Sequence, residues 1–161
     1  LSMLDSMNLW IEIARDDLLT VMQSVDLIII NDGEVRMLAG DDNLVRASRK
    51  LISMVNCHTL IIKKGENGVL AFHNGEILAL PAYPTENVVD PTGCGDSFAG
   101  TIAACLASAS GPITKSELRD ALIRATVTAS FTLESFGTSG LLSLTIERFN
   151  SRLQQFQDIL S

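Results

Sequence analysis

Two short runs of continuous apolar residues place the strongest limit on what this chain can fold into. They are VDLIIIN at residues 25–31 and TLIIKKG at residues 59–65. A strand with one face in water alternates apolar and polar residues, whereas a strand of a parallel sheet that is covered on both faces reads as an uninterrupted apolar run. We therefore expect an α/β fold with a mainly parallel sheet that is flanked by helices.

Helical patterns and turn signals surround these two runs. ENG at 66–68 and HNG at 73–75 predict a small antiparallel meander, and residues 1–4 resemble the tail of a further strand. Thr114 and Glu117 have the spacing of a capping box. The spacing of apolar residues predicts five helices: one over about Leu9–Ser24, with Ile11, Ala14, Leu18 and Met22 in phase, and four whose apolar faces carry Leu44, Ala47, Leu51 and Val55; Phe98, Ile102 and Leu106; Leu118, Leu122, Ala125 and Ala129; and Ile146, Phe149, Leu153 and Phe156. We expect residues 1–161 to form a single domain.

Charge and cysteine content exclude several classes of function. With 12 basic and 19 acidic residues the net charge is −7, and no basic cluster interrupts the acidic chain, which argues against nucleic acid or an anionic membrane as partner. No apolar run approaches the roughly 18 residues of a membrane span, and no secretory signal begins the sequence. Cys57, Cys94 and Cys105 lack a C-x-x-C spacing. We expect three reduced thiols in a cytoplasmic protein.

Residues 87–100 read NVVDPTGCGDSFAG, which we interpret as a strand end (NVVD), a turn (PTGCGD) and a helix that starts at Ser97 (SFAG). Gly93, Cys94 and Gly95 would then lie at a helix N-terminus, where free backbone N–H groups and the helix dipole attract an anion. The segment lacks the lysine of a Walker A loop and the third glycine of a dinucleotide-binding loop. It therefore predicts an anion site of another kind.

Asp96 gives this anion site a chemical interpretation. If the loop stabilises charge that develops on a phosphoryl group, an adjacent carboxylate can take the proton of an attacking hydroxyl. Phosphoryl transfer needs both parts. The alternative is a glycine-rich turn in which Asp96 only caps its helix.

The segment VVDPTGCGDSFAG resembles the C-terminal signature of the ribokinase-like (PfkB) carbohydrate kinases, with Cys94 where alanine is usual. The resemblance implies a ribokinase-like fold that uses ATP and Mg²⁺. It implies that Asp96 is the catalytic base and that the backbone amides of residues 93–96, including Gly93, Cys94 and Gly95, form the anion hole. Asp90 and Thr92 would lie where some members hold a monovalent cation such as K⁺.

NDGE at residues 31–34 resembles the N-x-x-E motif of the same family. The resemblance implies that Asn31 and Glu34 organise Mg²⁺ and its waters around the nucleotide phosphates, a task that suits a cation that binds few protein carboxylates. A helix cap explains the same four letters, and both interpretations stay open.

Two further segments resemble nucleotide-binding parts of the family. KKGENG at 63–68 implies that Lys63, Gly65 and Gly68 line the nucleotide site, although a β-turn would use the same residues. ASFTLESFG at 129–137 implies that Ala129, Ser130 and Gly137 lie near the adenine, although small residues also allow close packing of helices.

Cys94 carries a separate expectation. A thiol at a helix N-terminus beside open amides has a lowered pKa and mild reactivity. The carboxylate of Asp96 would act against this effect.

The resemblance covers nearly the whole chain but only the C-terminal half of such a kinase. The half that contacts the acceptor is not visible, so the acceptor, a sugar or a nucleoside, stays unidentified, and a non-catalytic ATP- or phosphate-binding module is the alternative function. Cutting a parallel sheet leaves an unpaired edge and uncovered apolar faces, in keeping with a mean hydropathy of +0.27. We expect marginal stability, or a homodimer through the truncated sheet edge.

Overall fold

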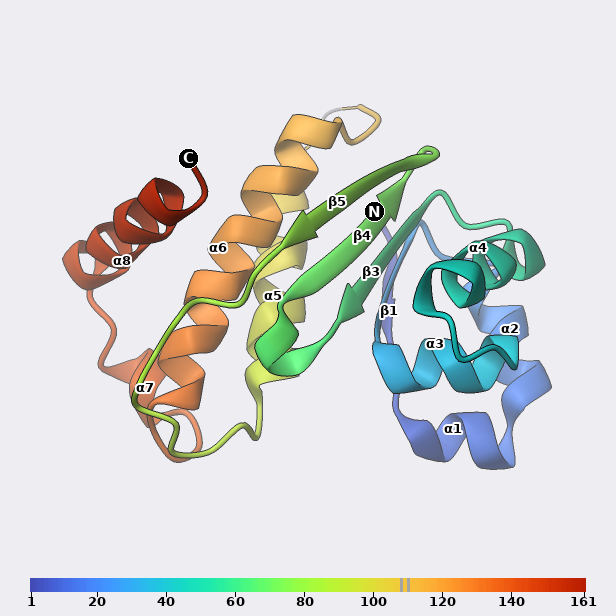
Figure 1. The fold of residues 1–161 in the computed structure, drawn as a ribbon, viewed down its shortest axis with the longest axis horizontal. Helices are drawn as coiled ribbons and strands as arrows, with labels where there is room; N and C mark the ends of the chain where they lie inside the picture. Colours follow the sequence, from blue (N-terminus) through green and yellow to red (C-terminus); the bar gives the residue numbers. More distant parts are fainter. Residues whose placement is uncertain (108, 110) are drawn as a thin grey trace. The chain divides into compact units, whose positions relative to one another are not determined.

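A mixed five-stranded sheet organises the first part of the chain in the computed structural model, which describes residues 1–107, 109 and 111–161. The strands are Met3–Asp5 (β1), Leu27–Asn31 (β2), Thr59–Lys63 (β3), Val69–His73 (β4) and Glu76–Leu80 (β5), and their spatial order is β1-β2-β3-β4-β5 (Figure 1). Contacts within the chain define two compact units, Leu1–Ala79 and Leu80–Ser161.

The sheet confirms the interpretation of the two apolar runs. β2 pairs in parallel with both β1 and β3, whereas β3 and β4 are antiparallel, with the 3₁₀ turn Gly65–Asn67 between them. The two central strands, β2 and β3, are buried on both faces except at their last residues, Asn31 and Lys63. The expected α/β fold with a small antiparallel meander is therefore confirmed.

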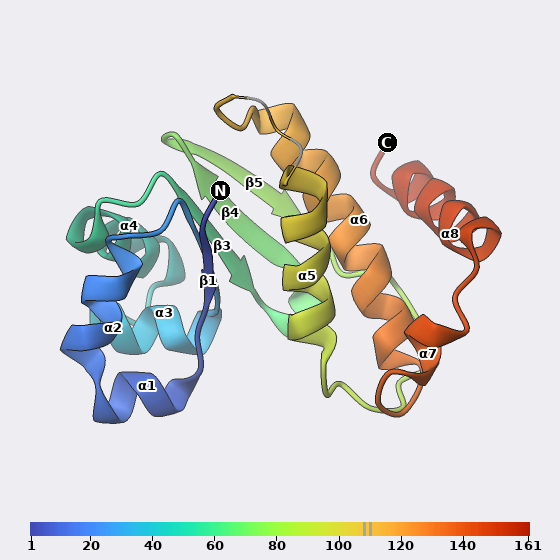
Figure 2. The ribbon, with the colours of Figure 1, turned by 180° about the vertical axis from the view of Figure 1, so that it is seen from behind.

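Four helices cover one face of this sheet: Asn8–Ile13 (α1), Arg15–Met22 (α2), Asp32–Ala39 (α3) and Leu44–Val55 (α4) (Figures 1 and 2). The alternate strand residues Ile28, Ile30, Leu60, Ile62 and Phe72 join one apolar core with side chains of these helices. The predicted face of α4 is confirmed, because Ala47, Leu51 and Val55 lie in that core and Leu44 packs at its margin.

The single helix predicted over Leu9–Ser24 is wrong. The chain breaks at Ala14, whose backbone (φ −148°, ψ 41°) separates α1 from α2. Directly after the break, Arg15 donates a hydrogen bond from Nη2 to the carbonyl of Leu38 at 2.8 Å. The helical periodicity continues through both helices, because Ile11, Leu18 and Met22 all lie in the core. The apolar pattern therefore fits one helix or two, and the hydrogen bond from Arg15 to α3 is a contact that the pattern does not predict.

The second unit contains Cys94–Leu106 (α5), Lys115–Leu133 (α6), Ser139–Leu142 (α7) and Ile146–Ile159 (α8). Figures 1 and 2 both show α5 alongside α6. Thr114 and Glu117 form the predicted capping box at the start of α6. The expected face of α8 is partly wrong, because Leu153 and Phe156 are buried whereas Ile146 is 71% exposed.

Arg152 joins α8 to α6. Its guanidinium donates to Ser130 Oγ at 3.0 Å and to Glu134 Oε2 at 2.9 Å, and it lies 3.7 Å from the centre of the Phe131 ring. Both partners of the Arg152–Glu134 ion pair are 17% exposed. Because the ions are paired and hydrogen-bonded, their partial burial is compensated, and α8 is fixed to the C-terminal end of α6.

Residues 87–90, predicted as the end of a strand, belong to no strand. Val88 and Val89 are exposed, and the N–H groups of Val89 and Asp90 both donate to the carbonyl of Leu133 at the end of α6, at 3.0 and 3.2 Å. Two adjacent valines are typical of a strand, but here a helix terminus satisfies the backbone donors.

Among the described residues, no helix is both long enough and apolar enough to cross a membrane.

Candidate functional site

The glycine-rich turn meets its helix earlier than the sequence predicted. α5 begins at Cys94 rather than Ser97, and Gly93 is its N-cap with φ +83°. This left-handed conformation is costly for residues with a Cβ, so the sequence needs a glycine there. A Cβ at Gly93 would also lie 3.7 Å from Cγ2 of Thr132. The turn therefore presents its backbone at the positive end of a 13-residue helix.

Three of the four amides expected in the anion hole are open. The N–H of Cys94 donates to the carbonyl of Pro91 at 3.1 Å. Within the described chain, the N–H groups of Gly93, Gly95 and Asp96 have no internal acceptor. The site therefore differs from the expectation at one residue, because Cys94 uses its amide to close the turn. The other three donors can bind an anion.

Asp96 is the third residue of α5, and its side chain is exposed. In the part of the chain that the structure describes, no side chain forms an ion pair or a hydrogen bond with its carboxylate. The carboxylate thus lies beside the open amides with its oxygens available to a proton donor.

The lowered pKa expected for Cys94 is wrong. Burial raises the pKa of the Cys94 thiol, and the nearby Asp90 carboxylate raises it further. The thiol donates a long hydrogen bond of 3.6 Å to the carbonyl of Ala129. Cys94 is therefore a half-buried contact between the turn and α6.

Asp90 and Thr92, the expected monovalent cation ligands, contact each other. Asp90 Oδ1 accepts the N–H of Thr92 at 2.9 Å, and hydrogen bonds from Thr92 lower the pKa of the Asp90 carboxyl. This local contact fixes the entry into the turn.

In the first unit, Asn31 and Glu34 form a reciprocal capping box on α3. Asn31 Oδ1 accepts the N–H of Glu34, and Glu34 Oε2 accepts the N–H of Asn31, both at 2.8 Å. Glu34 is 1% exposed, and burial raises its pKa despite the opposing hydrogen bond from Asn31 and the charge of Lys63. The helix-cap interpretation is thus realised. It occupies Oδ1, the one side-chain oxygen of Asn31, and Oε2, one of the two carboxylate oxygens of Glu34.

Lys63 lies beside Asn31 at the carboxyl ends of the parallel strands. Its ammonium group contacts both carboxylate oxygens of Asp5, at 2.9 and 2.7 Å, and so spans from β3 across to β1. Sequence reasoning missed Asp5. Asp5 could have been predicted from its place as an acidic residue at the end of β1, the strand that pairs with β2. Gly65 is the first residue of the 3₁₀ turn that follows and Gly68 is its C-cap, both with positive φ.

The residues expected near the adenine, at 129–137, include both buried and exposed positions. Ser130 is buried, donates to the carbonyl of Val127 and accepts from Arg152, so its hydroxyl belongs to the contact with α8. Ala129 is half-buried, and its carbonyl receives the Cys94 thiol. Gly137 is exposed with φ +57°. The structure therefore brings Ala129 into contact with the glycine turn through its carbonyl.

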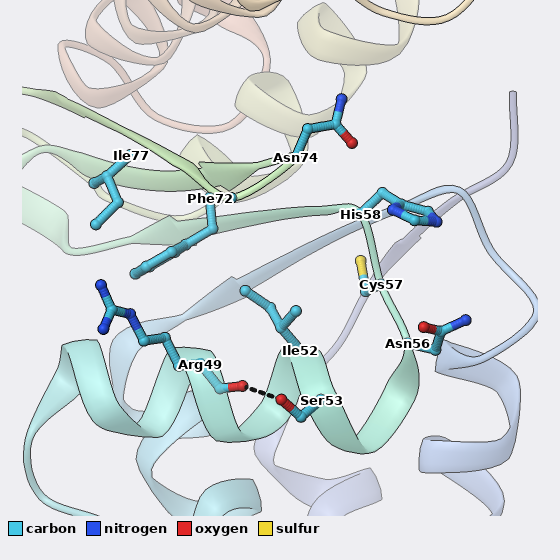
Figure 3. A pocket seen from close by; sticks show the side chains of 10 residues that line it. Arg49, Ile52, Ser53, Asn56, Cys57, His58, Phe72, Asn74 and Ile77 are labelled. Carbon is cyan, nitrogen blue, oxygen red and sulfur yellow. Dashed lines mark hydrogen bonds between the residues drawn. The ribbon is translucent and has the colours of Figure 1, made fainter.

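A cavity of about 530 Å³ lies elsewhere in the first unit, between α4 and the β4–β5 hairpin (Figure 3). It opens near Cys57 and His58, at the amino end of β3, whereas Lys63 is at the carboxyl end. None of the predicted site residues lines this cavity. Its lining includes Arg49, Ile52, Ser53, Phe72, Asn74 and Ile77.

Solved structures with the same fold define the class to which this chain is similar. The aminoimidazole riboside kinase from Salmonella enterica, complexed with aminoimidazole riboside and an ATP analogue, aligns with 94% of this chain and 51% of its own at TM-score 0.77 and 23% identity. A putative ribokinase II from E. coli in complex with ATP and Mg²⁺ aligns with 94% of this chain and 47% of its own, at TM-score 0.74 and 24% identity. The fold is therefore ribokinase-like.

Sequence comparison gives the family itself. The model of the pfkB family carbohydrate kinases matches residues 2–144, and the chain belongs to this family. The cytidine kinase of Thermococcus kodakarensis is 38% identical over 88 residues, which are 53% of this chain and 31% of that protein. The fructokinase of Klebsiella pneumoniae is 31% identical over 94 residues, 58% of this chain and 30% of its own. The chain thus spans about a third of these curated relatives and about half of the solved kinases.

Proposed function

We propose that residues 1–161 are the nucleotide-binding and catalytic part of an ATP-dependent kinase that transfers the γ-phosphoryl group of ATP to a hydroxyl of a sugar or nucleoside. One observation carries the proposal: the exposed, unpaired Asp96 carboxylate lies on the same helix turn as three open backbone amides, in a chain of the pfkB family. The printed names of its relatives, a cytidine kinase and a fructokinase, support a nucleoside or sugar acceptor.

The open amides and the carboxylate divide the work of the reaction. The N–H groups of Gly93, Gly95 and Asp96 hold the phosphoryl oxygens as negative charge develops on them. The Asp96 carboxylate takes the proton of the acceptor hydroxyl as its oxygen attacks phosphorus, and ADP leaves.

Magnesium and the nucleotide would be held through the ends of the strands. No group of three or more His, Cys, Asp or Glu within the described ranges could hold a metal ion. This fits Mg²⁺, which is bound by few carboxylates together with waters and substrate phosphates. Asn31 and Glu34 would orient those waters, Glu34 through Oε1 and Asn31 through Nδ2, the side-chain atoms that the capping box leaves without a partner. When bound, the ion neutralises charge on the phosphates.

The remaining roles follow from the same family pattern. Lys63, Gly65 and Gly68 would line the nucleotide site, with Ala129, Ser130 and Gly137 toward the adenine. Asp90 and Thr92 would bind a monovalent cation such as K⁺. A cytoplasmic enzyme with a small-molecule acceptor fits the acidic chain, which bears no basic cluster.

An Asp96→Asn variant tests the assignment of the base. It keeps the shape of the side chain and removes the proton acceptor, so MgATP affinity should persist while phosphoryl transfer falls by about 10²- to 10⁴-fold. Calorimetry measures the first quantity and ADP release over a panel of sugars and nucleosides the second. Asp158→Asn is the matched control, because Asp158 accepts a hydrogen bond from Gln154 that an asparagine can keep. Near-normal turnover of Asp96→Asn would overturn the assignment.

A second function has a specific observation in its favour. The chain aligns with only about half of each of these solved kinases. We infer from the family pattern that the residues that bind the acceptor lie in the half that does not align. A module that binds MgATP without transfer would show the calorimetric signal but no ADP release with any acceptor.

A further inference from the structure

The hydroxyl of Thr132 differs from three other hydroxyls of α6. Thr126, Thr128 and Ser130 each donate to a carbonyl of their own helix, those of Leu122, Arg124 and Val127. This is the usual partner of a helical serine or threonine. Thr132, at 2% exposure, instead donates across to Ser97 Oγ on α5 at 2.9 Å.

The hydrogen bond continues from Ser97 into the glycine turn. Ser97 Oγ donates to the carbonyl of Cys94 at 3.1 Å. That carbonyl belongs to the peptide unit whose N–H is the open amide of Gly95. One buried side chain therefore supports the turn through a pair of hydroxyl groups.

The same end of α6 holds the entry to the turn. The carbonyl of Leu133 accepts the N–H groups of Val89 and Asp90, and the carbonyl of Ala129 accepts the Cys94 thiol. The carbonyl of Leu133, the last residue of α6, has no partner within the helix and is therefore available to this loop. The last turn of α6 thus contacts the segment from Val89 to Ser97 at several points.

We propose that Thr132 is a positioning residue that holds the anion-binding amides in place through Ser97. The inference rests on the proposed function for its consequence in ATP binding, whereas the support of the turn is independent of it. Thr132 touches neither phosphate nor acceptor. It acts by fixing the peptide unit between Cys94 and Gly95, because preorganised donors cost no reorganisation when they bind an anion.

Three variants of the 161-residue chain separate positioning from ordinary core stability. Thr132→Val keeps the branched shape and removes the hydroxyl. Thr132→Ser keeps the hydroxyl and removes the methyl group. Thr126→Val is the matched control, because it also removes a buried hydroxyl of α6, but one that donates only to the carbonyl of Leu122.

The two measurements are calorimetric MgATP affinity and amide hydrogen exchange at Cys94 and Ser97, whose N–H groups donate to the carbonyls of Pro91 and Gly93. We expect Thr132→Val to speed exchange at these two amides about two- to tenfold, the range that corresponds to one hydrogen bond, and to weaken MgATP binding by a similar factor. Thr132→Ser should restore both quantities, and Thr126→Val should change neither.

Unchanged exchange in Thr132→Val, or faster exchange with unchanged MgATP affinity, would overturn the positioning role. So would a Thr132→Ser variant that behaves like Thr132→Val. If the unsubstituted chain binds no MgATP, the proposed function of this chain fails instead, and the exchange comparison alone decides whether Thr132 supports the turn.

Discussion

Glu34 caps α3 with a carboxylate that is almost completely buried, and the two properties affect its ionisation in opposite directions. Its hydrogen bond from the N–H of Asn31 favours the charged form, whereas burial disfavours it. Burial is the larger effect, so the pKa is raised above the ordinary value of 4.5. A raised pKa in the folded state means that the ionised carboxylate costs stability above that pKa and costs nothing below 4.5.

A Glu34→Gln variant should therefore be more stable than the unsubstituted chain at pH 7. Its amide oxygen can still accept from Asn31, and it has no charge to desolvate. The gain should shrink as the pH falls through the raised pKa toward 4.5. Urea unfolding at several pH values measures the difference, and MgATP binding should weaken in parallel if Glu34 orients the metal.

Glu117→Gln is the control with the opposite sign. Glu117 has the same place in the capping box of α6, but hydrogen bonds from Thr114 lower its pKa. Its charge stabilises the fold above pH 4.5, and this contribution disappears as the pH falls through the lowered pKa. A Glu34→Gln variant that loses stability at pH 7, as Glu117→Gln should, would contradict the assignment.

At the scale of elements, local hydrogen bonds could be read from the sequence and long-range contacts could not. The capping box of Thr114 and Glu117 was predicted because its four backbone and side-chain groups lie within one turn. The break at Ala14 was not, because Arg15 finds its acceptor on Leu38, 23 residues away. The strand end predicted at Val88 and Val89 was wrong for the same reason, because the backbone of this segment donates to Leu133 rather than to a strand.

The candidate site divides in the same way. The glycine turn and Asp96 lie in one contiguous segment, so the sequence located them together. The hydrogen bond between Thr132 and Ser97 joins residues 35 positions apart, and the one between Lys63 and Asp5 joins residues 58 positions apart. No short sequence pattern predicts either contact.

Gly140 is a further residue that only the packing of elements explains. A Cβ there would lie 2.2 Å from the carbonyl oxygen of Phe131, which means that α7 crosses the end of α6 at backbone contact distance. We expect Gly140→Ala to destabilise the chain by about 1–3 kcal/mol, the usual cost of overpacking. Urea unfolding measures it.

Gly100→Ala is the control for Gly140→Ala. Gly100 is an exposed residue inside α5, and a Cβ there meets nothing within 4 Å. Alanine favours a helix over glycine by up to about 1 kcal/mol, so this variant should gain stability. Equal effects of the two substitutions on the free energy of unfolding would mean that the close approach of α7 to α6 does not limit the size of residue 140.

At the scale of the whole molecule, one side of the first unit combines an open sheet edge with exposed apolar side chains. β1 is the first strand in the sheet order and pairs only with β2. The helix that follows it, α1, and the residue before that helix expose Met7, Leu9, Trp10 and Ile13 at 45–65%. Unpaired strand edges next to apolar surface favour association, and we propose a second copy of this chain as the occupant.

Light scattering after size exclusion tests this association. The chain should show a mass above 17.4 kDa that rises with concentration, and Trp10→Lys should return it to the monomer by placing a charge in the apolar face. Leu142→Lys is the control, since Leu142 is 83% exposed in the second unit, away from β1 in the sequence. A monomer at every concentration, with sharp unfolding, would show that this face is stable in water. An equal response to both lysines would show that association does not use the β1 edge. If Trp10→Lys alone returns the chain to the monomer, the second copy binds the side of the first unit that carries the β1 edge and α1.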